Sequence, residues 1–301
     1  MIKNFDELFE QLRSRSKKRL VAAWAVDNHT ITAVSMAIDK GIVEGTLVGD
    51  KDMILNVCKE ENIDPAKFNI VDNKVELKAI AQAVSMVKNG EGDILMKGLC
   101  STDKYMRGIL NKENGLLPAK ATLSHVSVVL NPSYPKFIVI GDMAVIPAPD
   151  FKQKQAILKY CVNTAKALGV EKPKVAMIAA TEQMLNGMPA CVEAALIAKM
   201  ADRGQIGGCY VDGPLALDVA LNKEAAAIKK LTSPVAGDAD CLVFPAIEPA
   251  NVFYKTNTML CPGVKTAAIV AGAEAPCVLS SRADSVDTKL NSIALAAITA
   301  K

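Results

Sequence analysis

Short apolar runs alternate with helical patterns along the chain, and this alternation restricts the possible folds more than any other feature of the sequence. The apolar runs of the first half lie at residues 20–26, 45–49, 68–71, 93–98, 126–130 and 136–142. Segments between them, such as 32–41 and 75–90, carry apolar residues at spacings of three and four and end on glycine, as amphipathic helices do. Nearly continuous apolar strands separated by such helices are typical of parallel sheets covered on both faces. The sequence therefore predicts an α/β fold with layered, mainly parallel sheets.

Pro147 and Pro149 interrupt this alternation in the middle of the chain. A long helical pattern follows at 151–169, and strand and helix patterns then start again. The chain has 301 residues, whereas a single hydrophobic core stops growing at ~250 residues. We therefore expect a first α/β domain over residues 1–148 and a second over 149–276. Periodicity alone does not decide which of the two the terminal helix pattern joins.

The charge balance excludes several classes of partner. The chain has 35 basic and 32 acidic residues, and 4% of its residues are aromatic. A net charge of +3 supplies no field for broad nucleic-acid or anionic-membrane binding, and few aromatic rings are present for base stacking. No run reaches the ~18 apolar residues of a membrane-spanning helix, since Glu274 and Pro276 break the longest one. We expect neither a nucleic-acid nor a membrane partner, so any anion site must be local.

Cysteine and histidine usage indicates the compartment and the absence of a metal. The eight cysteines form no C-x-x-C pair, and the chain starts with a polar, helix-patterned segment. Both features favour a reducing cytoplasm. Two histidines without close cysteine spacing predict no zinc site. Asp238 and Asp240 fit turn chemistry better than a magnesium site, so we expect no metal.

The residues that follow the apolar runs are the candidate functional residues, because ligands of open α/β sheets bind at the carboxyl ends of strands. Lys97, Ser101, Thr102 and Arg107 follow one run, and these cations and hydroxyls suit a phosphate or an oxyanion. For Arg107, an ordinary exposed helical arginine is the favoured alternative. The usual glycine-rich dinucleotide and nucleoside-triphosphate loops are absent from the sequence.

A second cluster spans residues 280–285 and joins an apolar strand to a helix. Asp284 or Ser285 can cap that helix, whose free N–H groups attract anions, and Arg282 can bind a phosphate through two nitrogens. A capped helix with a solvated arginine explains the same residues equally well.

Taken together, the longer segments resemble the phosphate acyltransferases, most closely the phosphate butyryltransferase branch. The segments that carry the resemblance are 96–110, 142–150, 188–221, 235–255 and 278–296. The resemblance implies a two-domain α/β architecture like that of isocitrate and isopropylmalate dehydrogenases, with an interdomain cleft and with residues 277–301 returning to the first domain. It also implies a homodimer or higher homo-oligomer.

The same resemblance implies a reaction between acyl-CoA and phosphate that yields acyl phosphate and coenzyme A in a ternary complex, with no metal and no permanently bound cofactor. Ser281 would orient the coenzyme A thiol, Arg282 would hold the phosphoryl or carbonyl oxygen, and Arg107 would be a second cation for the phosphate. The expected substrate-binding residues are Lys97, Ser101, Thr102, Asp284 and Ser285.

The sequence departs from the acetyl-type pattern at the position of that pattern's proposed base, where Thr288 stands. Asp287 lies one residue earlier, and one residue turns a helical side chain by about 100°. Asp287 and Asp284 therefore both remain candidates for the base. The departure favours the butyryl-type branch over a phosphate acetyltransferase. Two further alternatives are a metal- and NAD-dependent dehydrogenase and a non-catalytic module that binds coenzyme A. The sequence determines neither the length of the acyl group nor the direction of the reaction.

Overall fold

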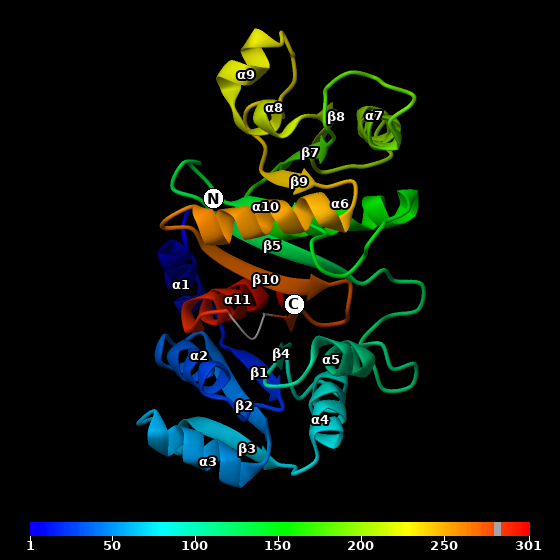
Figure 1. The fold of residues 1–301 in the computed structure, drawn as a ribbon. Helices are drawn as coiled ribbons and strands as arrows, with labels where there is room; N and C mark the ends of the chain where they lie inside the picture. The colour runs from blue at the N-terminus through cyan, green and yellow to red at the C-terminus, as the bar shows by residue number, and fades with distance from the viewer. Residues whose placement is uncertain (280–283) are drawn as a thin grey trace. The chain divides into compact units, whose positions relative to one another are not determined.

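The computed structural model describes residues 1–279 and 284–301 (Figure 1). Contacts group the chain into two compact units. The first unit consists of Phe5–Leu123 and Ala267–Lys301, and the second consists of Met1–Asn4 and Ser124–Thr266. Both contain strands covered by helices, so the predicted α/β class is confirmed.

The first unit contains a mostly parallel sheet in the order β3-β2-β1-β4-β11-β10, in which β10 alone of these described strands runs antiparallel to its neighbour β11. The strands are β1 (Lys18–Ala23), β2 (Val43–Gly49), β3 (Phe68–Asp72), β4 (Ile94–Lys97), β10 (Lys265–Ala271) and β11 (Cys277–Val278). The helices are α1 (Phe5–Arg13), α2 (Asn28–Asp39), α3 (Lys51–Glu60), α4 (Glu76–Lys88), α5 (Thr102–Ile109) and α11 (Val286–Thr299), with a short 3₁₀ helix at Pro65–Lys67.

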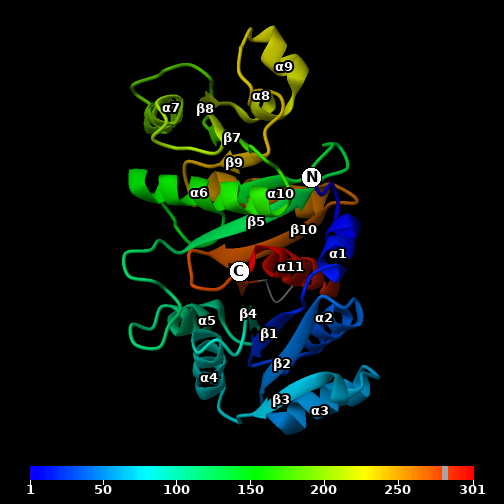
Figure 2. The same ribbon diagram turned by 180° about the vertical axis from the view of Figure 1, so that it is seen from behind.

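The central strands of this sheet are buried, as the apolar runs predicted. All of β4 is buried, and so is β1 from Leu20 onward. Helix α4 packs on β1 and β2, while α11 packs on α2 and α1. Figures 1 and 2 show α11 beside α2 from both sides. The C-terminal helix thus packs in the same unit as the N-terminal strands. Helical periodicity alone did not determine which unit it joins.

The second unit contains strands in the order β5-β6-β9-β7-β8. Strands β5 and β6 are antiparallel, and the other pairs are parallel. The strands are β5 (Ser124–Leu130), β6 (Ile138–Gly141), β7 (Lys174–Ile178), β8 (Tyr210–Leu215) and β9 (Cys241–Val243). The helices are α6 (Phe151–Ala167), α7 (Pro189–Asp202), α8 (Leu217–Leu221), α9 (Lys223–Ile228) and α10 (Ile247–Leu260).

The boundaries between the two compact units differ from the predicted domain boundaries. The contact pattern changes at residues 123/124 and 266/267, whereas the sequence predicted changes at 148/149 and 276/277. Strand β6 explains the first difference, because it pairs in parallel with β9, with Gly141 opposite Val243. An apolar run shows that a strand forms but not which strand it joins. Whether the two units fold as independent domains stays a prediction.

Within the described ranges, no helix is both long and apolar enough to cross a lipid bilayer.

Candidate active site

Three adjacent parallel strands of the first unit, β1, β4 and β11, end at the same edge of its sheet. Ala23 lies opposite Lys97, so the ends of β1 and β4 coincide. Carboxyl ends of parallel strands are the usual ligand sites of such sheets. Every predicted site residue that the structure describes belongs to this unit.

A close backbone contact at the end of β4 places Lys97. The N–H of Gly98 donates to the carbonyl of Ala23 at 3.0 Å, and the N–H of Leu99 donates to that of Trp24 at 2.9 Å. A Cβ atom on Gly98 would lie 2.3 Å from the Trp24 carbonyl oxygen, so only glycine fits there. Lys97 is buried, and its Nζ donates to the Gly98 carbonyl at 3.2 Å. The turn therefore holds an ammonium group inside the strand-end region.

Helix α5 begins directly after this turn. The Ser101 hydroxyl accepts from the N–H of Lys104 at 3.3 Å and caps the helix, while Thr102 at the first helical position is exposed. Arg107 lies on an exposed face, with its Nε 3.0 Å from a carboxylate oxygen of Asp103 one turn earlier. This contact is an ordinary surface ion pair, which contributes little to stability. The geometry fits the alternative of an exposed helical arginine, and a phosphate contact by Arg107 stays a prediction.

Ser281 and Arg282 lie outside the described residues. The residues that follow them are described, and they settle which side chain caps α11. The Ser285 hydroxyl accepts from the N–H of Thr288 at 3.2 Å, so Ser285 is the cap. Asp284 is half-buried and Asp287 is exposed. The two candidate bases thus differ in environment.

Sequence reasoning missed the buried lysine of this region. Lys289 in the first turn of α11 is only 4% exposed. Burial lowers the pKa of its ammonium, and the charges of Asp27 and Asp284 oppose that shift. No clear signal marked it, because polar residues such as Thr288 and Asn291 stand on either side of it, as at the exposed start of an ordinary helix.

Asp27 follows β1 and caps α2. Its Oδ2 accepts from the N–H of Thr30 at 3.0 Å. Its Oδ1 and the Thr30 hydroxyl oxygen are buried without a hydrogen-bond partner among the described residues. Native proteins leave few buried polar atoms unsatisfied. The strand-end region therefore contains the buried ammonium groups of Lys97 and Lys289 and the carboxylates of Asp27 and Asp284. It also contains two buried oxygen atoms that lack a hydrogen-bond partner among the described residues.

Asp238 and Asp240, considered above for magnesium, are bound by lysines in the second unit. Lys136 Nζ lies 2.6 Å from Asp240 Oδ1 and 2.9 Å from Asp238 Oδ1, and Lys174 also pairs with Asp238. Outside residues 280–283, no group of three or more histidine, cysteine, aspartate or glutamate side chains is arranged to hold a metal ion. The structure therefore explains this pair as part of an ion-pair network.

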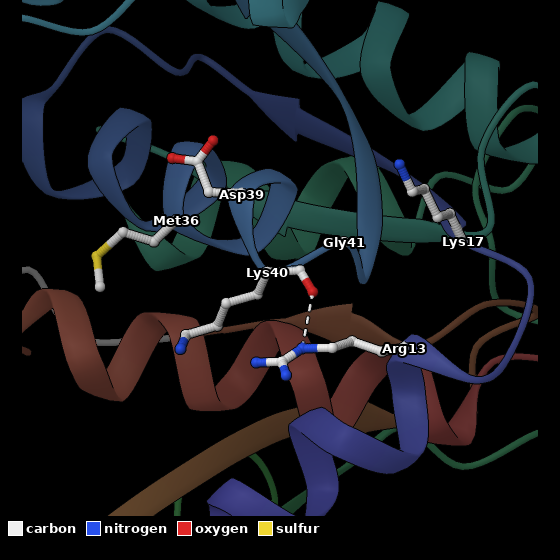
Figure 3. Close-up of a pocket in the computed structure, with 6 residues that line it drawn as sticks. All are labelled: Arg13, Lys17, Met36, Asp39, Lys40 and Gly41. Carbon is white, nitrogen blue, oxygen red and sulfur yellow. Dashed lines mark hydrogen bonds between the residues drawn. The ribbon is translucent and has the colours of Figure 1, made fainter.

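A separate hollow of about 590 Å³ lies at the opposite end of the strands in the first unit. Figure 3 shows its lining residues, among which Arg13 Nε donates to the Lys40 carbonyl at 3.3 Å. Lys17 immediately precedes β1, and Gly41 lies just ahead of β2. The hollow is thus at the amino ends of these strands and is not part of the candidate site.

Comparisons with known proteins point to one family. The family model described as phosphate acetyl/butaryl transferase matches residues 73–297. A phosphate butyryltransferase from Clostridium acetobutylicum is 44% identical over 300 residues, which cover 100% of this chain and 99% of the relative. A phosphate acetyltransferase from Thermotoga maritima is 41% identical, covering 97% of this chain and 98% of the relative. The crystal structure of a branched-chain phosphotransacylase from Enterococcus faecalis matches with a TM-score of 0.82 and 28% identity, over 94% of this chain and 98% of that one.

Proposed function

The chain belongs to the phosphate acetyl/butaryl transferase family and is a phosphate acyltransferase, and we propose that its reaction is butanoyl-CoA + phosphate = butanoyl phosphate + CoA. The observation that carries this choice is the 44% identity to a phosphate butyryltransferase along the whole chain. Thr288, at the position where the acetyl-type pattern has its base, supports the same branch. A phosphate acetyltransferase is the second candidate, favoured by the 41% identity to such an enzyme.

The transfer is direct within a ternary complex. An oxygen of hydrogen phosphate attacks the thioester carbon, a C–O bond forms, and the C–S bond breaks. The proton that the phosphate loses passes to the departing sulfur, so atoms and charge balance. In reverse, the sulfur attacks the acyl phosphate carbon. Since a thiol has a pKa of about 8.5, a group that accepts its proton speeds that direction.

The strand-end residues supply the functions that this chemistry needs. Ser281 orients the thiol, and Arg282 and Arg107 bind anionic oxygens, as the family resemblance implies. Lys97 supports this assignment because its buried ammonium adds a fixed positive charge next to the α5 N-terminus. Ser101, Thr102 and Ser285 supply hydroxyls at the starts of α5 and α11. Holding both substrates in one orientation removes several kcal/mol of the bimolecular entropy cost.

Coenzyme A and phosphate act as substrates, and the proposal includes no permanently bound cofactor or metal. It also includes a cytoplasmic location and a homodimer or higher homo-oligomer. The architecture of isocitrate and isopropylmalate dehydrogenases, with an interdomain cleft, stays a prediction.

The test is a substrate series with the purified protein, phosphate, and acetyl-, propionyl-, butanoyl- or isobutyryl-CoA. We expect the highest kcat/KM with butanoyl-CoA, because one methylene in an apolar pocket changes the specificity by about 10- to 200-fold. Release of the coenzyme A thiol is the measurement, with phosphate omitted as the control.

A maximum with acetyl-CoA would establish the second candidate instead. Absence of turnover with all four substrates would overturn both. Loss of activity in a chelator would contradict the metal-free proposal.

A further inference from the structure

Lys289 occupies a position that general physics disfavours for a lysine. It is the fourth residue of α11, and every residue of this helix from Lys289 to Ile298 is buried. The N-terminal end of a helix carries partial positive charge, which repels an ammonium group. Burying a charge also costs free energy that a buried ion pair often does not recover. Stability alone therefore does not explain this residue.

Two carboxylates act on the Lys289 ammonium from different segments. Asp27 lies between β1 and α2, and α2 packs against α11. Asp284 lies just ahead of α11, and the negative charges of both residues favour the protonated lysine. The ammonium thus lies in the field of groups that are 262 residues and five residues away in sequence.

Asp27 retains hydrogen-bonding capacity in this arrangement. Its Oδ2 is used by the cap of α2, whereas its Oδ1 is buried without a partner among the described residues, as is the Thr30 hydroxyl oxygen. A carboxylate that only capped the helix would not need a second buried oxygen left unpaired. The location at the carboxyl end of β1, next to β4, makes a functional reason the better explanation.

We propose that Lys289 is a positioning residue for acyl transfer, whose buried ammonium, attracted by Asp27 and Asp284, fixes the first turn of α11 against the N-terminus of α2. The inference rests on the proposed function. Helix α11 follows the segment that contains Ser281 and Arg282, and α2 follows β1. The electrostatic link therefore sets where the first turn of α11 stands relative to the strand ends.

The experiment compares the full-length wild type with Lys289→Met, which removes the charge and keeps the length of the side chain. We expect kcat to fall about ten- to a hundredfold, as small misplacements of reacting groups do. KM for butanoyl-CoA and for phosphate should stay within about twofold, since the lysine touches neither substrate. Tm should fall, because the variant leaves the Asp27 carboxylate without the opposite charge of the lysine, so recovery by a variant that keeps the charge is needed to separate positioning from stability.

Two further variants separate positioning from a merely structural role. Lys289→Arg restores the charge and should recover part of kcat. Asp27→Asn keeps a helix cap but removes the carboxylate, and it should lower kcat as well. The double variant Asp27→Asn/Lys289→Met should lose no more kcat than the less active single variant, since the effects of coupled residues are not additive.

Lys78→Met is the matched control, because Lys78 is an exposed lysine in the first turn of α4 and should leave kcat unchanged. Wild-type turnover checks the proposed function separately. Given that turnover, an unchanged kcat in Lys289→Met would overturn the inference alone. The inference would also be overturned if the double variant lost kcat by the product of the two single losses. It would likewise be overturned if kcat fell only together with Tm and Lys289→Arg did not recover it.

Discussion

Asp284 and Asp287 lie on either side of the start of α11 and differ in what surrounds them. Asp287 is exposed in the first turn, whereas Asp284 is half-buried just ahead of the helix. The charge of Asp284 also acts on the buried ammonium of Lys289. A carboxylate that takes up a proton during catalysis needs a defined, partly desolvated position. The surroundings of Asp284 therefore favour it over Asp287 as the base.

Replacing each carboxylate by its amide tests that choice. We expect Asp284→Asn to lower kcat about 10²- to 10⁴-fold, the usual contribution of a general acid or base. Asp287→Asn should change kcat little and is the matched control. Initial rates of acyl phosphate formation and of the reverse reaction measure both effects. The opposite order would assign the base to Asp287.

At the scale of elements, α11 is held by its cap and by a side-chain bridge to the sheet of the first unit. The Ser292 hydroxyl accepts from the N–H of Ala268 on β10 at 3.0 Å and donates to the Thr288 carbonyl at 2.8 Å. Ser285 caps the preceding turn by accepting from the N–H of Thr288. The helix that follows the candidate site is therefore oriented by polar contacts as well as by burial.

Removal of the cap should weaken this helix measurably. Ser285→Ala is expected to lower the free energy of unfolding by about 1 kcal/mol, because the N–H of Thr288 loses its acceptor. Ser285→Asp should retain the cap and most of the stability. Urea unfolding followed by circular dichroism measures the difference. Equal stability of the alanine variant and the wild type would show that the cap contributes nothing.

At the scale of the whole molecule, an ion-pair network in the second unit makes stability depend on pH. Burial raises the pKa of Asp238, but hydrogen bonds and charge from Lys174 and Lys136 outweigh it, so the pKa of this carboxyl lies below its ordinary value. A carboxyl group with a lower pKa in the folded state stabilises the protein above its unfolded pKa of about 3.9. That contribution is lost as the pH falls through the folded-state pKa.

Asp238→Asn should therefore lower Tm at neutral pH, and the difference from the wild type should shrink as the pH falls below about 4. Thermal unfolding at a series of pH values is the measurement. A Tm difference that stays constant down to pH 2 would contradict this account of Asp238.

Local patterns predicted much of this structure. The strands and helices lie close to where the apolar runs and helical spacings put them, as β2 and α6 illustrate. The cap of α11 was narrowed to Asp284 or Ser285 by a short-range signal, because a polar side chain two or three residues ahead of free N–H groups needs no distant partner. The family resemblance rested on contiguous segments as well.

Tertiary packing decided the rest. Strand β6 pairs with β9, about 100 residues later, as well as with its sequence neighbour β5, because pairing depends on which faces can be buried together. Asp27 and Lys289 act on each other only because α2 packs against α11. The sequence by itself determined the elements and the family and narrowed the cap of α11 to two residues, since those depend on neighbouring residues. Which charges share a buried environment was decided by contacts between residues far apart in the chain, which no local pattern encodes.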